Sequence, residues 1–94
     1  MKTLTENTTR NYVPVEVPGT DVTLEFSQSV RDGVTRISAT PKKGGSPMGL
    51  MTYNVGEKSL TVSLKPLEGK NLENIEKILT TLGRGILEIL GEDK

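Results

Sequence analysis

The apolar residues of this 94-residue chain recur with two different periods. Between about residue 12 and residue 65, large apolar side chains alternate with polar ones, which is the spacing of β-strands. From residue 71 to residue 90 they recur at steps of three and four, which places them on one stripe of an α-helix. The pattern therefore predicts a sheet followed by one long helix.

The alternating part of the chain divides into segments separated by turn residues. Strands are expected at about residues 12–17, 20–30, 34–40, 50–55 and 59–65. Asp32-Gly33 predicts a tight hairpin, because a primed two-residue turn requires positive φ. Residues 41–49 contain three glycines and two prolines and are expected to be an irregular loop. One apolar and one polar face on each strand indicates an antiparallel sheet that is covered on a single side.

The helix is expected over about residues 71–90, with Asn71 as its N-cap. The main apolar stripe consists of Leu72, Ile75, Leu79, Leu82, Ile86 and Ile89, whereas Ile78, Leu87 and Leu90 lie beside it. Gly83 and Gly85 interrupt the pattern, and each glycine costs about 1 kcal/mol relative to alanine inside a helix. Either the helix bends or ends there, or another group packs closely against the bare backbone.

Together these elements predict an α+β fold in a single domain over residues 11–94. An antiparallel sheet of about five strands, arranged as hairpins, would carry one long C-terminal helix on one face. A chain of this length has room for one core. Residues 1–10 contain one large apolar residue, Leu4, and are expected to form a flexible N-terminal arm. The order of the strands stays open, because hairpin signals identify only neighbours.

Residue types that are missing from the chain limit its chemistry. There is no histidine and no cysteine, which removes the commonest general base, the usual zinc ligands and the thiolate nucleophile. The aspartates Asp21, Asp32 and Asp93 are far apart in the sequence. We therefore expect no catalytic residues, no cofactor and no metal site, in a protein that is not an enzyme. No segment has the length of a membrane span or the apolar core of a secretion signal, so a cytoplasmic protein is expected.

The helical stripe is richer than one sheet requires. Nine of the nineteen positions 72–90 are large aliphatic residues, whereas about a third of a helix's circumference suffices to cover a sheet. We therefore expect a small non-enzymatic protein-interaction or regulatory module, a homodimer that associates through the helix or a sheet edge and binds a protein partner. The expected interface residues are Ile78, Leu82, Ile86, Leu87, Leu90 and Met48.

Nucleic-acid binding is the alternative. Lys42 and Lys43 in the glycine-rich segment 41–49, with Arg31 and Arg36, could contact an anion or a nucleic-acid backbone. The formal net charge of zero argues against a broad electrostatic footprint for nucleic acid or an anionic membrane. A third interpretation is a small-ligand carrier, with a pocket between helix and sheet that the helical glycines help to line.

Overall fold

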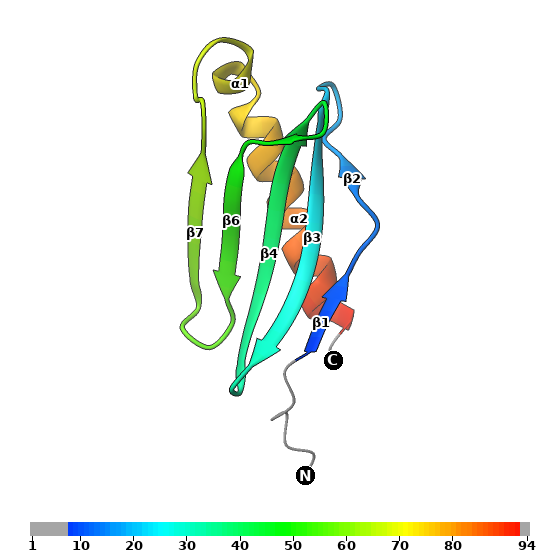
Figure 1. The fold of residues 1–94 in the computed structure, drawn as a ribbon, viewed down its shortest axis with the longest axis vertical. Coiled ribbons are helices and arrows are strands. Elements are labelled where there is room, and N and C mark those ends of the chain that lie inside the picture. The colour runs from blue at the N-terminus through cyan, green and yellow to red at the C-terminus, as the bar shows by residue number, and fades with distance from the viewer. Residues whose placement is uncertain (1–7, 93–94) are drawn as a thin grey trace.

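Residues 8–92 are described by the computed structural model, and they form an antiparallel sheet with a C-terminal helix across one face (Figure 1). The α+β fold expected from the sequence is confirmed. The strands are β1 (Thr8–Asn11), β2 (Val15–Glu16), β3 (Val22–Arg31), β4 (Val34–Lys43), β5 (Ser46–Pro47), β6 (Gly49–Asn54) and β7 (Ser59–Leu64), and the helices are α1 (Gly69–Glu73) and α2 (Ile75–Glu92). The sheet has the order β1-β3-β4-β6-β7, with β2 beside β3 and β5 beside β4.

The hairpin of β3 and β4 is the centre of the sheet. Arg31 pairs directly with Val34, so Asp32 and Gly33 alone make the turn. Their φ angles are 53° and 80°, as the Asp-Gly pair predicts. A two-residue turn with positive φ at both positions follows the right-handed twist of the strands it joins.

The N-terminal strand differs from its expected position. Of the expected arm, residues 1–7 lie outside the described part of the chain, whereas residues 8–10 belong to β1, which pairs with β3. The strand expected at 12–17 is reduced to Val15–Glu16, because Pro14 has no N–H to donate to the ladder. Tyr12 still attaches this segment to the sheet, since its N–H donates to the carbonyl of Phe26 at 3.0 Å.

The expectation of an irregular loop over residues 41–49 is wrong for most of that segment. β4 continues to Lys43, and Ser46–Pro47 returns along it as β5. Gly44 and Gly45, with φ angles of 60° and 85°, reverse the chain in two residues, which leaves the flanking residues free to pair.

The helical region is two helices instead of one. Asn74, with φ −90° and ψ 3°, separates α1 from α2. Asn71 is not an N-cap: Glu68 occupies that position in α1, and the side-chain amide of Asn71 donates to the carbonyl of Pro66 at 2.9 Å. This bond attaches α1 to the segment before it, and the chain changes direction before α2 begins. α2 then continues through Gly83 and Gly85 without interruption.

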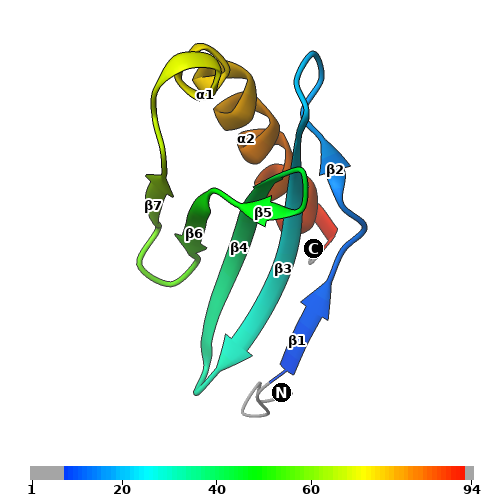
Figure 2. The same cartoon turned by 45° about the horizontal axis from the view of Figure 1, so that its top comes forward.

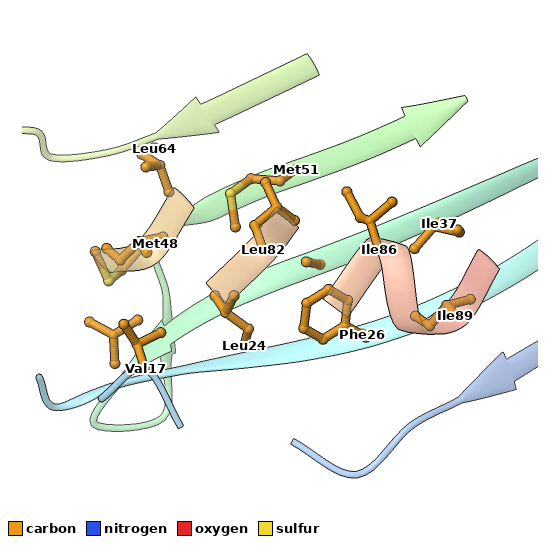
Figure 3. Close-up of a cluster of buried hydrophobic side chains, with 13 residues drawn as sticks. Val17, Leu24, Phe26, Ile37, Met48, Met51, Leu64, Leu82, Ile86 and Ile89 are labelled. Atoms are coloured by element: carbon orange, nitrogen blue, oxygen red, sulfur yellow. The ribbon is translucent and has the colours of Figure 1, made fainter. Parts of the chain in front are cut away.

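The core lies between α2 and the sheet (Figure 3). Inward positions of the strands alternate with outward ones, as the period of two requires. The buried apolar residues are Val17, Val22, Leu24, Phe26, Ile37, Ala39, Met48, Met51 and Leu64 before the helices, and Ile78, Leu82, Ile86 and Ile89 in α2. Full burial of one such aliphatic side chain contributes roughly 1.5–3 kcal/mol, so the contact with α2 is a principal source of stability.

Candidate protein-interaction surface

α2 does not cover the whole of the sheet face on which it lies. In two views the helix lies behind β4 and β3, and β7 lies to one side of it (Figure 1 and Figure 2). Leu60 and Val62 of β7 are directly opposite Tyr53 and Met51 of β6, so all four side chains point to the helix side. Met51 is fully buried, whereas Leu60 is 51% and Val62 40% exposed. The helix side of β7 is therefore an uncovered apolar edge.

Leu79 of α2 lies on the flank of the helix that faces this edge. Successive residues of an α-helix are rotated by about 100° around the helix axis. By this rotation Leu79 and Ile86 lie on the same side of the buried line that runs through Ile78 and Leu82. Ile86 lies toward β4 and β6 in Figure 3, and Leu79 therefore lies on the β6–β7 side too. Its side chain is 39% exposed. We call Leu60, Val62 and Leu79 the β7 strip.

The main chain of β7 is available along the same edge. The N–H of Lys65 donates to the carbonyl of Met48, so the hydrogen-bonding groups of alternate residues before it, Ser63 and Thr61, also point to β6. The N–H and C=O groups of Leu60 and Val62 point the other way. Among residues 8–92 no strand pairs with this outer side, because the sheet order ends at β7.

The two edges of the sheet differ in their protection against pairing with another chain. Proline, charged residues and irregular backbone are the usual means by which an edge strand avoids such pairing. The edge at β1 and β2 has all three, with Arg10, Pro14 and Glu16 and a break between its strands. β7, with the sequence Ser-Leu-Thr-Val-Ser-Leu, has neither proline nor charge.

The opposite face of the sheet is polar and lacks aromatic side chains. A row of paired residues crosses the five principal strands there: Asn11, Ser27, Ser38, Thr52 and Thr61. The three aromatic residues of the chain, Tyr12, Phe26 and Tyr53, all pack in or against the core on the helix side. Single-stranded nucleic acid is commonly bound by stacking on exposed aromatic rings, which this face does not offer.

The basic residues expected to contact nucleic acid do not form one patch. The Nζ of Lys42 is 3.1 Å from the Oε1 of Glu25, and the Nζ of Lys43 is 3.9 Å from the Oδ2 of Asp21. Arg31 lies at the other end of the β3–β4 hairpin, roughly 27 Å away for eight residues of extended strand at about 3.4 Å each. Arg36 lies between these ends, opposite Ser29. The alternative function gains no support from this arrangement.

The residues expected to form the partner interface lie mostly in the protein's own core. Ile78 is 0% exposed, and Leu82, Ile86 and Met48 are buried with it. Leu90 is partly buried against the same core. Leu87 alone of the six is largely exposed, at 70%, on the side of α2 away from the sheet. Expecting Ile78 outside the main apolar stripe was wrong, because the sheet-facing line of α2 passes through it.

The β7 strip was not recognised from the sequence, because alternation predicts only that Leu60 and Val62 share a face with buried residues. The available signal was the absence of charge from residue 59 to residue 64.

The space between α2 and the sheet is not a large pocket at the helical glycines. Gly85 is in contact with the ring of Phe26, and nothing lies within 4 Å of the position that a Cβ at Gly83 would take. An open hollow of about 150 Å³ lies beside Gly85, and Val13 and Val15 are among the residues that line it. Small-molecule sites usually measure about 300–1,000 Å³, so this hollow does not favour a ligand carrier.

Comparison with protein-family models, curated proteins and solved structures finds no match for this chain. Within residues 8–92, no three side chains of the His, Cys, Asp and Glu types are grouped in a way that could hold a metal ion. In the same residues, no helix is both long enough and apolar enough to cross a membrane.

Proposed function

We propose that this protein is a small non-enzymatic interaction or regulatory module, homodimeric in solution, whose β7 strip is the surface on which protein chains associate. The observation that carries the proposal is the exposure of Leu60 and Val62 on the edge strand β7, whose outward main-chain groups are available. Scattered exposed aliphatic residues are normal in soluble proteins. Here they coincide with β7, an edge strand that has neither charge nor proline.

The expected mode of association is strand addition. An extended segment hydrogen-bonds to the outward N–H and C=O groups of an edge strand, and apolar side chains at alternate positions supply the rest of the affinity. The chain lacks both histidine and cysteine, which supports a non-enzymatic role. The absence of cysteine fits a reducing compartment, and the location that we propose is the cytoplasm.

Sedimentation velocity over a wide range of protein concentration tests the proposal. The wild-type protein is expected to shift from monomer to dimer with rising concentration, and an apolar interface should be nearly indifferent to salt. Leu60→Lys should shift the equilibrium toward monomer, because it places a charge in the strip.

Leu50→Lys is the matched control, since Leu50 is 49% exposed on the other face of the sheet and the chemical change is the same. A wild-type protein that stays monomeric at every concentration contradicts the proposal. So does an equal effect of the two lysine variants.

A further inference from the structure

We infer that the edge of β7 is occupied by β7 of a second copy of this chain, with the two strands antiparallel and the twofold axis at Thr61. The inference rests on the proposed function and goes beyond it by naming the partner, the strand and the register. Three features of β7 support it: the direction of its main-chain groups, the pattern of its side chains and the limits of its extended segment.

The pattern of β7 is complementary to itself. In a symmetric antiparallel pair the same strand is used by both copies, so each contact is made twice. The outward main-chain groups belong to Leu60, Val62 and Leu64, so residues of this set are opposite one another across the new pair. Their side chains point to the helix side in both copies, because opposed residues share a face. Apolar side chains therefore meet apolar ones, and Thr61 lies with other hydroxyl residues on the polar face.

The extent of β7 and the burial of Leu64 select the register. With the axis at Thr61, the exposed residues Leu60 and Val62 are opposite each other, and every pair from Ser59 to Ser63 lies within the strand. An axis at Val62 places Leu60 opposite Leu64, which is only 8% exposed in its own chain. An axis at Leu60 places Val62 opposite Lys58, which lies in the turn before β7 with a φ angle of 57°. Only the axis at Thr61 brings both exposed apolar residues of one copy against those of the other.

This pairing produces a shared surface that neither copy has alone. A twofold axis between antiparallel strands is perpendicular to the sheet, so both α2 helices lie on the same side of one continuous sheet. Leu60 and Val62 of both copies form the floor of an apolar trough between the helices, with Leu79 on each flank. Each copy supplies half of this trough.

Engineered cysteines test the register directly, because the chain contains none of its own. In this register the N–H and C=O groups of Thr61 point away from the second copy, so Thr61 and its copy form a non-hydrogen-bonded pair. The Cα atoms of such a pair are about 4.5 Å apart. That separation lies within the range of about 4.4–6.8 Å for disulfides. Mild oxidation should therefore convert Thr61→Cys to a covalent dimer.

Cysteines elsewhere on the strand provide the controls. In this register Ser63 is opposite Ser59 of the second copy. The two Ser63 residues of the dimer are four positions apart along the strand, about 13 Å, and the two Ser59 residues are equally far apart. Ser59→Cys and Ser63→Cys should each remain unlinked alone and should link to each other when mixed. Thr9→Cys, on the edge strand β1, reports the background of random collision.

The outcomes separate this inference from the proposed function. A dimer that depends on Leu60 but is not linked by Thr61→Cys overturns the pairing with its axis at Thr61 and leaves the proposed function standing. Efficient linking of Ser63→Cys or Ser59→Cys alone also overturns the register. A protein that is monomeric throughout overturns both.

Discussion

Gly85 of α2 lies directly against the ring of Phe26 of β3, so closely that a Cβ at position 85 would overlap the ring. The glycine, unfavourable inside a helix by itself, allows α2 to approach the sheet over its largest core side chain. With Gly85 turned toward Phe26, the flank of α2 that carries Ile86 lies on the β6–β7 side.

Alanine substitutions at the two helical glycines should have opposite effects on stability. Gly85→Ala should lower the free energy of unfolding by about 1–3 kcal/mol, because the new methyl group overlaps the Phe26 ring in a packed core. Gly83→Ala is the matched control: its Cβ meets nothing within 4 Å, so it should stabilise by up to about 1 kcal/mol through helix propensity. Urea unfolding of both variants measures the difference. Equal effects at the two positions would show that the approach of Phe26 is not required.

Alanine substitutions of Ile78 and Leu87 should change the free energy of unfolding by very different amounts, because one side chain is buried and the other is exposed on the same helix. Ile78→Ala should cost about 2–5 kcal/mol, because Ile78 has no exposed surface. Leu87→Ala should change stability by less than about 0.5 kcal/mol, because its side chain is mostly in solvent. Denaturant unfolding gives both values.

The same Leu87 variant also tests how the protein associates. Leu87→Ala should leave the dimer affinity unchanged, because Leu87 lies on the side of α2 away from the sheet. Dissociation of the dimer by this variant, measured by sedimentation, would point to a helix-mediated interface instead of one at β7.

Gly49 should tolerate no side chain. Its φ angle is 134°, and an added Cβ would overlap the main-chain carbonyl of Ser63 on the paired strand β7. Gly49→Ala should therefore destabilise by about 1–3 kcal/mol, toward the upper end because a backbone carbonyl in a ladder cannot move aside. Gly56→Ala is the control. A Cβ at position 56 would lie 3.5 Å from the Oδ1 of Asn54, which is an ordinary van der Waals contact. Thermal unfolding that ranks the two variants equally would contradict this account of the β6–β7 contact.

The protein should not retain single-stranded oligonucleotides on a filter, even at low salt. Lys42 and Lys43 each lie close to a carboxylate, and Arg31 lies at the far end of the hairpin, so no concentrated positive field results. Retention that falls steeply with salt, and that Lys42→Gln reduces, would revive nucleic-acid binding. A lysine-rich peptide bound to the same oligonucleotide verifies the assay.

Local patterns predicted much of the fold. Alternation located β3, β4, β6 and β7 to within a few residues, and Asp32-Gly33 identified the central turn. The glycines in the helical stretch raised the question of a close contact, which Gly85 makes with Phe26. The expected partner-binding residues were less well predicted: the periodicity of the helix identifies its apolar side but not how wide a sheet it has to cover.

By itself the sequence determined the type of each main element, the antiparallel pairing of its hairpins and the single face that a helix covers. These depend on spacing and turn chemistry within a few residues. Only the tertiary structure decided that a break at Asn74 redirects the chain, that Ile78 lies at the centre of the contact and that β7 lies beyond the helix. Those outcomes depend on where α2 crosses the sheet, and that position results from contacts between residues far apart in the chain, which no local pattern records.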